Sequence, residues 1–267
     1  MSLPNYEIFA IRYAERNAKR ADHFIGGDPH DAPMPMDYFT WIIKGAGRVI
    51  AVDTGFTEPV GTRRGRKHLR DPAETMARLD IDHRELTDVI LTHMHYDHVG
   101  GWASYPKARF HLQEKEMQFV TSRHMQYPIF GHSFEPNEVV GLVRLNFQGK
   151  VAFHNGEDEI APGITLHHVG GHTAGLQIVR VHTARGWVVL ASDSSHYFEH
   201  IRTNRAFTVA YHVGDMIDAF RTVEKLADSP DHIIPGHDPL VMKLYPAASL
   251  ALENIIIRLD VDPRQLA

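Results

Sequence analysis

The sequence predicts an α/β fold, a four-layer αββα sandwich in which two β-sheets pack face to face and helices cover their outer faces. Strand-like apolar runs occur in the N-terminal half and again in the C-terminal half, and helical patterns follow each group. The chain has 267 residues, of which 43% are hydrophobic, so it can bury a sizeable core. Because no repeat and no long Pro/Gly/Ser linker divides the chain, we expect a single domain over residues 1–267.

The expected strands are short runs that are either continuously apolar or alternate between apolar and polar residues. They are Tyr6–Tyr13, Tyr38–Lys44, Arg48–Asp53, Thr87–Thr92, Ala108–Leu112, Val151–His154, Ile164–Val169, Leu176–Val181, Trp187–Ser192 and His232–Pro235.

Four segments show the helical period. Asp71 is expected to cap the first of them, with Pro72 at its first position. The third carries an apolar stripe that includes Met216, Phe220 and Val223. The expected helices are Pro72–Leu79, Gln113–Thr121, Gly214–Ala227 and Pro246–Leu259.

Two segments fit neither pattern and are interpreted as surface loops. Residues 26–35 are crowded with Gly, Pro, Asp and His, and residues 122–149 mix aromatic and turn-forming residues with little periodicity. Functional loops are often this long, so residues 26–39 and 122–149 are candidate substrate loops. Their apolar side chains either line an entrance or pack into the domain: Met34, Met36, Tyr38, Phe39, Tyr127, Phe130 and Phe134.

Composition excludes several classes of function. The 28 Lys and Arg residues against 33 Asp and Glu residues give a formal net charge of −5, which argues against nucleic acid as a partner. The chain has no cysteine, so disulfides, thiolate nucleophiles and Cys-ligated zinc are excluded. Its 20 histidines instead favour a metal site built on His, Asp and Glu.

The start of the chain, Met1 to Tyr6, has no basic region followed by an apolar one, and no uncharged apolar run approaches the roughly 20 residues of a spanning helix. From these features we expect a soluble, cytoplasmic protein that does not bind membranes.

The densest chemical feature is the segment from His93 to His98, which follows the apolar run 88–91. It holds four potential metal ligands in six residues: His93, His95, Asp97 and His98. At a strand end the first two project to the same side, and the next turn can direct the other two toward a second point nearby. Imidazole and carboxylate are suitable ligands for Zn²⁺ and related ions, so this segment can contribute to two metal sites.

This segment matches the HxHxDH signature of the metallo-β-lactamase superfamily. Further motifs of that superfamily follow in order: the turn around His172 resembles G-H-T-x-G, Asp193 ends a strand, and His237 follows another apolar run. Residues 52–55 are similar to the family's early D-T-G turn, which contains Asp53 here. The resemblance covers Arg48 to Asp238 and implies the metallo-β-lactamase fold.

The resemblance also implies a ligand set. His93, His95 and His172 would bind one metal ion, Asp97, His98 and His237 the other, and Asp193 would bridge them. Five neutral imidazoles and two carboxylates leave a net positive centre with two divalent ions, which lowers the pKa of a bridging water. Two Zn²⁺ ions are expected, with Mn²⁺, Fe²⁺ or Co²⁺ as alternatives. We expect Asp53 to orient the motif loop by accepting an imidazole N–H rather than to bind metal.

Among the branches of the superfamily, the chain is most similar to the N-acyl homoserine lactonases. The common zinc β-lactamases have Cys at the position of Asp193, and the flavodiiron proteins have Glu at the position of His95. The lactonase pattern places a tyrosine three residues after the bridging aspartate, where it hydrogen-bonds the substrate carbonyl. Here that position is His196, and Tyr197 follows one residue later, so either side chain is a candidate for this role.

The implied activity is that of a metal-dependent hydrolase that opens a lactone ring by attack of a metal-bridging hydroxide. The expected substrate is an N-acyl homoserine lactone, which would make the protein a quorum-quenching enzyme. Asp97 is expected to relay the proton of the attacking hydroxide to the leaving alkoxide, because it is the carboxylate nearest to both of these oxygens.

Three alternatives remain open. The first is a hydrolase of another small lactone or ester in catabolism. The second is a thioesterase similar to glyoxalase II, although only about 30 residues follow His237, where such enzymes typically carry a helical domain. The third is a metal-binding protein without catalysis, which the open coordination positions disfavour.

Two further segments have more than one interpretation. The basic run 63–70 either clamps an anionic substrate or forms a solvated loop, and the sequence favours the solvated loop. The segment Tyr6–Tyr13 and the apolar loops make a homodimer possible, as the resemblance to lactonases suggests.

Overall fold

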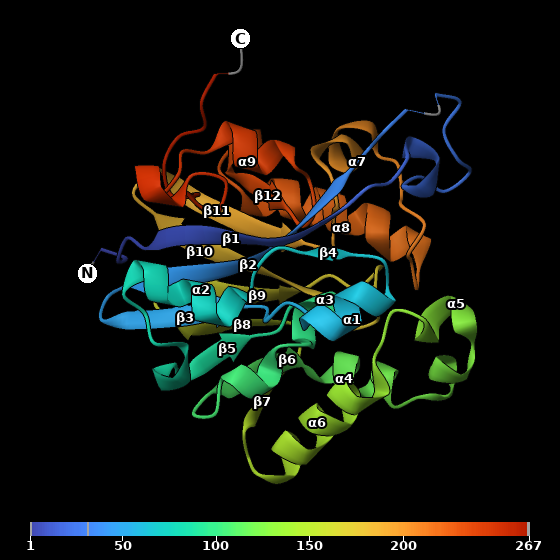
Figure 1. Cartoon of the computed structure of the whole chain (residues 1–267), viewed down its shortest axis with the longest axis horizontal. Coiled ribbons are helices and arrows are strands. Elements are labelled where there is room, and N and C mark those ends of the chain that lie inside the picture. Colours follow the sequence, from blue (N-terminus) through green and yellow to red (C-terminus); the bar gives the residue numbers. More distant parts are fainter. Residues whose placement is uncertain (1, 31, 266–267) are drawn as a thin grey trace.

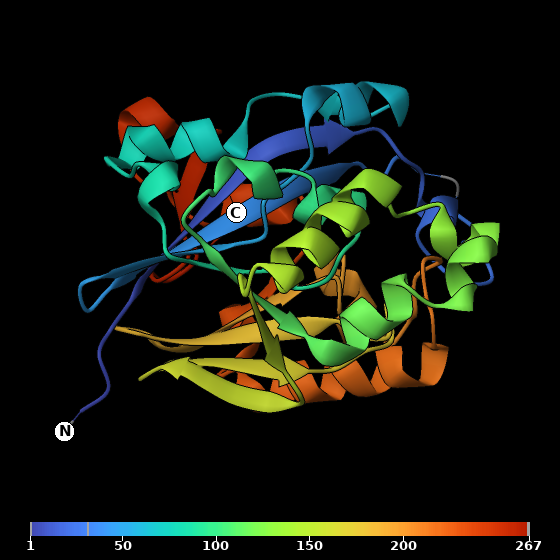
Figure 2. The same ribbon diagram turned by 90° about the horizontal axis from the view of Figure 1, so that it is seen from below.

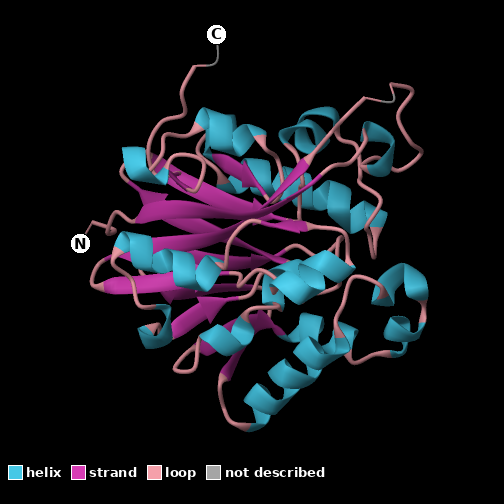
Figure 3. Ribbon diagram, viewed as in Figure 1, coloured by secondary structure: helices cyan, strands magenta, loops and turns pink. Residues whose placement is uncertain are grey.

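The computed structural model describes residues 2–30 and 32–265. Figure 2 shows four layers in which the two sheets lie between outer layers of helices, so the predicted αββα sandwich is confirmed. In Figure 3 the helices surround the strands on the outer faces. Among the described residues, no helix is long and apolar enough to cross a bilayer.

The first sheet mixes antiparallel and parallel strands. Its order is β13-β1-β2-β3-β5-β6-β7, with β4 paired to the far end of β1. The pairs β3·β5, β5·β6 and β6·β7 are parallel, so these strands end at the same edge of the sheet. The bounds are β1 Glu7–Arg16, β2 Met36–Gly45, β3 Arg48–Val52, β4 Lys67–His68, β5 Asp88–Ile90, β6 Arg109–Gln113, β7 Val151–His154 and β13 Ile256–Arg258.

The second sheet has the order β12-β11-β10-β9-β8, in which only β11 and β12 are parallel. Its strands are β8 Glu157–Ala161, β9 Ile164–His168, β10 Gln177–Thr183, β11 Gly186–Ser192 and β12 Ile233–Pro235.

Helices cover both outer faces (Figure 1). The longest are α6 Pro136–Phe147 beside the first sheet and α8 Val213–Leu226 on the second. The other α-helices are α1 Glu58–Arg63, α2 Pro72–Thr75, α3 Tyr96–Val99, α4 Glu114–Val120, α5 Pro128–Gly131, α7 Phe198–Thr203 and α9 Leu240–Leu244. Single 3₁₀ turns are η1 Arg20–Asp22, η2 Met76–Leu79, η3 His83–Glu85, η4 Trp102–Ser104, η5 Arg123–Gln126, η6 Pro230–His232 and η7 Leu250–Leu252.

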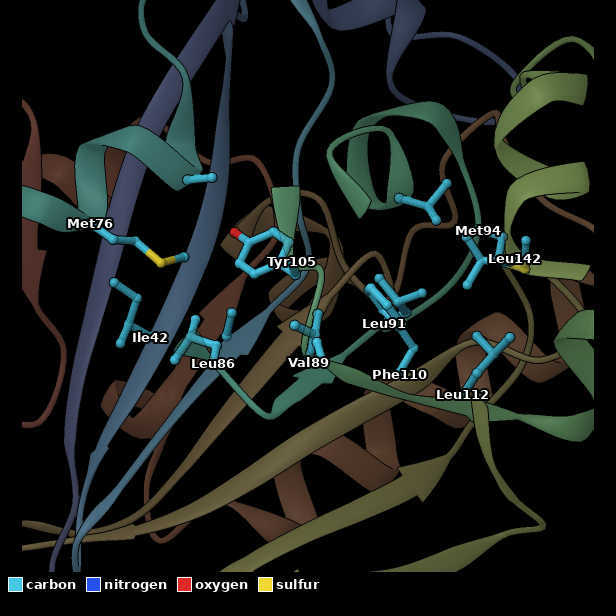
Figure 4. Close-up of a cluster of buried hydrophobic side chains, with 14 of the residues drawn as sticks. Ile42, Met76, Leu86, Val89, Leu91, Met94, Tyr105, Phe110, Leu112 and Leu142 are labelled. Atoms are coloured by element: carbon cyan, nitrogen blue, oxygen red, sulfur yellow. The ribbon is translucent and has the colours of Figure 1, made fainter. Parts of the chain in front are cut away.

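Side-chain alternation along the strands divides the core into layers. On β2, Trp41 and Ile43 enter the cluster between the sheets, while Ile42 joins the cluster beneath the helices of the first sheet. Figure 4 shows the cluster beneath the helices of the first sheet, in which Val89 and Phe110 lie between Met76 and Leu142. On the other side, α8 buries the stripe expected from its period against the second sheet.

Most expected elements are present, and the N-terminal cap is confirmed because the Asp71 carboxylate accepts hydrogen bonds from the N–H groups of Ala73 and Glu74. The prediction of a helix over Pro246–Leu259 is wrong. That segment contains η7 and then β13, which pairs antiparallel with β1. Three consecutive isoleucines, 255–257, favour an extended strand, and the edge of β1 supplies the hydrogen bonds that a helix would otherwise make.

The two expected loops are partly regular structure. Residues 36–39 begin β2, and residues 122–149 contain η5, α5 and the 12-residue α6. The buried face of α6 carries Leu142 and Leu145, but Glu138 and Gly141 interrupt its apolar stripe. The helical period is therefore weak in the sequence.

Candidate metal centre

The HxHxDH segment lies where the parallel strands β3 and β5 end. Residues 91–95 leave β5, and α3 begins at Tyr96 and carries Asp97 and His98. Asp53 follows β3 with φ 61°, a left-handed conformation that is uncommon for a residue other than glycine. This bend directs the Asp53 carboxylate toward the neighbouring segment.

Hydrogen bonds to Asp53 hold the HxHxDH segment in place. Its Oδ1 accepts the backbone N–H of Thr92 at 2.8 Å, and its Oδ2 lies 2.7 Å from His98 Nδ1. The Thr92 hydroxyl donates to Asp53 and lies 2.8 Å from the Ser192 hydroxyl, which joins the two sheets. The expectation that Asp53 accepts an imidazole N–H of the motif is confirmed.

The second sheet brings the other three residues to the same edge. His172 lies in the turn between β9 and β10, Asp193 follows β11, and His237 follows β12. Since β11 and β12 are parallel, their two following residues reach one end of the sandwich.

Glu116 on α4 holds the two ligand-bearing turns together, and sequence analysis did not identify it. Its Oε1 accepts the backbone N–H of Met94 at 2.9 Å, and its Oε2 accepts from Thr173 Oγ1 at 2.7 Å and from the N–H of Gly175 at 2.9 Å. Any side chain at Gly175 would collide with the Glu116 backbone. Burial raises the pKa of the Glu116 carboxyl, although these hydrogen bonds oppose the increase.

The seven residues that the sequence singled out as ligands form two clusters that share one carboxylate. In each of the triads His93/His95/His172 and Asp97/His98/His237, one ligand atom per residue lies within 4.8 Å of the others. The Asp193 carboxylate lies between the triads, with Oδ2 3.2 Å from His172 Nε2 and Oδ1 3.1 Å from His237 Nε2. All seven side chains are buried.

The unpaired atoms in this cluster fit bound cations. Within residues 2–30 and 32–265, His98 Nε2, His172 Nε2 and Asp193 Oδ1 are buried without a hydrogen-bond partner. His93 Nε2 and His95 Nδ1 face each other at 3.1 Å. Free nitrogen lone pairs and a carboxylate oxygen that converge in this way are the donor set of a zinc-type site.

Backbone carbonyls select the ring nitrogen that is free. His172 Nδ1 lies 2.7 Å from the Val209 carbonyl, and His237 Nδ1 lies 2.9 Å from the Asp37 carbonyl. A nitrogen that donates to a carbonyl carries the proton, so Nε2 of each ring presents its lone pair to the centre.

Burial and nearby charges shift the pKa values of the imidazoles in this cluster in opposite directions. Burial, reinforced by neighbouring imidazoles, holds the pKa of His93 and of His95 well below the usual range, which favours the neutral form of both rings. Burial also opposes protonation of His98 and His237, but the neighbouring carboxylates, Asp193 foremost, together outweigh it and raise the pKa of both. Burial would raise the pKa of Asp193, yet the imidazoles of His237 and His98 hold it well below its usual range.

The cluster opens into a cavity of about 110 Å³. Sequence analysis named Met36, Tyr38 and His196 as candidates for the site or its entrance, and favoured a solvated loop for the run that contains Arg64 and Arg66. Besides five of the seven residues, the cavity wall contains ten further side chains. They are Arg16, Met36, Tyr38, Arg64, Arg66, Tyr96, His132, Ser133, His196 and Val209. Of the apolar residues expected to line an entrance, Met36 and Tyr38 do so, whereas Phe39 is buried in the core between the sheets.

The structure distinguishes His196 from Tyr197. His196 lines the cavity, stacks on Phe207 and places Nε2 3.0 Å from Asp193 Oδ2. The Tyr197 hydroxyl instead donates to the carbonyls of Met34 and Pro35, and the residue is not part of the cavity wall. This geometry does not support Tyr197 as a donor to a substrate carbonyl, because the residue after His196 faces the opposite way.

Two tyrosines from other parts of the chain reach the cavity. Tyr38 and Tyr96 both form part of the cavity wall, and the Tyr38 ring packs edge-on against His237. Tyr96 lies inside the motif itself, between His95 and Asp97, so its position in the sequence was the available signal.

Comparison with known proteins agrees with this geometry. The model of the metallo-beta-lactamase superfamily matches residues 35–237, more than half of the chain. The chain belongs to this superfamily. The predicted family is therefore confirmed, and the match extends through His237.

The similar proteins of this superfamily include lactonases. An N-acyl homoserine lactonase from a Bacillus species is 28% identical over 133 residues, which are 49% of this chain and 48% of that protein. The probable metallo-hydrolase Rv2300c of Mycobacterium tuberculosis (strain ATCC 25618 / H37Rv) is 27% identical over 170 residues, 56% of this chain and 54% of that protein. The chain spans about half the length of these relatives.

Solved structures share the fold over most of their length. An N-acyl homoserine lactone hydrolase, determined with N-hexanoyl-L-homoserine at its catalytic metal centre, aligns with a TM-score of 0.74 and 18% identity over 91% of this chain and 96% of that one. The dizinc quorum-quenching lactonase AidC aligns with a TM-score of 0.67 and 16% identity over 90% of each chain.

Replacing Asp53 by Asn should weaken metal binding about 10- to 100-fold, because the carboxylate that orients His98 is lost while all seven candidate ligands remain. Competition with a chromophoric chelator measures the affinity. Asp82→Asn is the matched control, since Asp82 is an exposed carboxylate paired with Arg84 on η3. Equal affinity in the Asp53 variant and the control would show that Asp53 does not support the centre.

Proposed function

We propose that this protein is a dinuclear-zinc hydrolase that opens the ring of a small lactone. The observation that supports this most directly is the convergence of seven buried His and Asp side chains, with unpaired donor atoms, on one cavity. Seven donors shared between two ions leave coordination positions open, which a purely structural site normally closes. The resemblance to N-acyl homoserine lactonases makes quorum-signal lactones the first substrates to test.

The proposed ligands are His93, His95 and His172 for one ion and Asp97, His98 and His237 for the other, with Asp193 between them. Two bound zinc ions would polarise an ester carbonyl and lower the pKa of a coordinated water, so that hydroxide is present near neutral pH. The same donors accept Mn²⁺, Fe²⁺ or Co²⁺. The contributions below are those of the protein's own side chains.

Asp97 is proposed to transfer the proton. Its Oδ2 lies 3.7 Å from Nε2 of both His98 and His237, and the residue forms part of the cavity wall. Tyr13 donates to the Asp97 backbone carbonyl at 2.7 Å, which fixes the position of the carboxylate. Asp97 can therefore accept a proton from the attacking water and return it to the ring oxygen when the C–O bond breaks.

His196 is proposed to position Asp193 rather than to contact the carbonyl. Its ring is held between Phe207 and the Asp193 carboxylate, and burial holds the pKa of His196 well below the usual range. A neutral His196 whose Nε2 carries the proton donates to Asp193 Oδ2 and fixes the bridging carboxylate.

Two other ester hydrolyses use the same type of centre. A catabolic hydrolase of a different small lactone or ester is favoured by the size of the cavity, about 110 Å³, which offers little room for a long acyl chain. A thioesterase similar to glyoxalase II is tested in the same assay with S-D-lactoylglutathione.

Ring opening releases a proton, so a pH indicator measures it on N-butanoyl and N-decanoyl homoserine lactone and on unsubstituted γ-butyrolactone. The zinc-loaded wild type should open at least one of these rings, and Asp193→Ala should not, because the shared carboxylate is lost. Turnover of S-D-lactoylglutathione without any ring opening would contradict the lactonase proposal and support a thioesterase activity. Tight zinc binding without hydrolysis of any ester, lactone or phosphodiester, charged or neutral, would contradict an enzymatic role.

Asp97→Asn should lower kcat for ring opening by about 10²- to 10⁴-fold at saturating zinc, because the proton relay is lost. Metal content is measured on the same samples, so that loss of the ion is separated from loss of the relay. An unchanged kcat and pH profile, with both ions retained, would exclude the proton-transfer role.

A further inference from the structure

The cavity beside the proposed metal centre carries more positive charge than hydrolysis of a neutral lactone requires. Three arginines line it: Arg16 from the end of β1, and Arg64 and Arg66 from the segment that joins α1 to β4. The carboxylates in the same wall are Asp97 and Asp193, which are already proposed as metal ligands. The three arginines differ in whether their charge is already neutralised.

The charge of Arg64 is already satisfied by the protein. Its Nε donates to Glu135 Oε1 at 2.8 Å and its Nη1 donates to the His132 carbonyl at 2.8 Å. The guanidinium also stacks on the Tyr96 ring, 4.1 Å from its centroid. Arg64 therefore lines the cavity, while its guanidinium charge is paired with the carboxylate of Glu135.

Arg66 is held in place by neutral groups. Its Nε donates to the Tyr96 hydroxyl at 3.0 Å, and its Nη1 donates to the Arg64 carbonyl at 2.6 Å. In the part of the chain that the structure describes, no carboxylate forms an ion pair with it and its Nη2 has no hydrogen-bond partner. The guanidinium is thus oriented while its charge stays available.

Arg16 is also without a carboxylate partner among residues 2–30 and 32–265. It pairs through the backbone with Met36, another residue of the cavity wall. The nearby carboxylates are engaged elsewhere, because Asp37 pairs with Arg12 at 2.7 Å and Glu15 pairs with Lys67 at 2.7 Å. Arg16 is partly buried and forms part of the cavity wall, so its charge is available to a group bound in the cavity.

Two partly buried guanidinium groups without counter-ions are costly beside a centre that would itself be positive. The chain as a whole carries a net charge of −5, so this local excess is not a general property of its surface. A guanidinium presents its N–H groups in a planar fork that matches a carboxylate, which makes it a specific receptor for an anionic group. The cavity is small, which favours a compact substrate.

We propose that the substrate is a compact lactone or ester that carries a carboxylate, and that Arg16 and Arg66 bind this carboxylate while the reacting carbonyl lies at the metal centre. The inference rests on the proposed function and narrows its substrate class. Water adds to the ring carbonyl, the ring C–O bond breaks, and the proton passes to the leaving oxygen. The product is a hydroxy acid with two carboxylates.

The test uses two substrates that differ only in charge: 5-oxooxolane-2-carboxylate and its primary amide, each as both enantiomers. The wild type should prefer the carboxylate by about 10- to 100-fold in kcat/KM, mainly through KM, because charge-assisted hydrogen bonds to the arginines are lost with the amide. In Arg16→Gln and in Arg66→Gln this preference should fall to a few-fold. Arg16→Lys and Arg66→Lys keep the charge but lose the planar fork, so they should retain part of it.

Arg63→Gln is the matched control. Arg63 is an exposed neighbour in the same basic run, pairs with Glu135 and does not line the cavity, so its loss should leave the preference unchanged. Equal turnover of carboxylate and amide by the wild type would overturn the inference and leave the lactonase proposal standing. The same holds if Arg63→Gln changes the preference as much as Arg16→Gln and Arg66→Gln do.

Calorimetry with glutarate, which has no bond to hydrolyse, separates the inference from the proposed function. The zinc-loaded wild type and Arg63→Gln should bind glutarate, and Arg16→Gln and Arg66→Gln should bind it at least about tenfold more weakly. Arginine-dependent binding without ring opening would support the anion site and contradict the lactonase reaction. Binding that is equal in all four proteins would overturn the anion site, whichever lactones are opened.

Discussion

Five imidazoles and two carboxylates are buried together at one edge of the sandwich, where their converging lone pairs are suited to bind cations. Buried nitrogen and oxygen atoms without partners are costly, so the unpaired atoms of His98, His172 and Asp193 would destabilise a protein that held nothing there. Much of the surrounding structure keeps these atoms in place. The parallel strands of both sheets end at this edge, and Asp53 and Glu116 fix the turns that follow them.

These supports come from groups that touch no proposed ion. Asp53 joins β3 to the motif, and Thr92 extends that connection to Ser192 on the second sheet. Glu116 joins the motif to the turn of His172. The two sheets are therefore connected at the site by buried hydrogen bonds as well as by the apolar core, and their separation at this edge is closely defined.

Charge would connect the proposed metal centre to the proposed substrate. A centre with two divalent ions would remain positive after Asp97 and Asp193 are counted, and the cavity wall beside it adds Arg16 and Arg66, which have no carboxylate partner in the part of the chain that the structure describes. An anionic substituent would satisfy both guanidinium groups and would lie in the cavity next to the reacting carbonyl. The same arrangement would discriminate against neutral lactones of similar shape.

The sequence pattern was sufficient for the layers, and the resemblance to the motifs of the superfamily supplied the seven candidate ligands. The sequence was insufficient where function depends on contacts between distant segments. Arg16 ends an ordinary strand, Arg66 lies in a basic run that resembles a solvated loop, and Glu116 lies on a short helix, so only the fold shows what they face. Tyr197 lies one residue after the position of the lactonase tyrosine. The extended backbone at this point turns its side chain away from the cavity. The strand β13 was missed because its pairing with β1 is not encoded in local periodicity.

The central claim is that the cluster holds two metal ions at once. The most direct measurement is the zinc stoichiometry of the chelator-stripped and reconstituted protein, by mass spectrometry of the element together with titration calorimetry. The account predicts about two equivalents per chain, bound tightly enough to survive gel filtration, because the two triads share Asp193. Saturation at one equivalent, or metal that is lost on filtration, would contradict it.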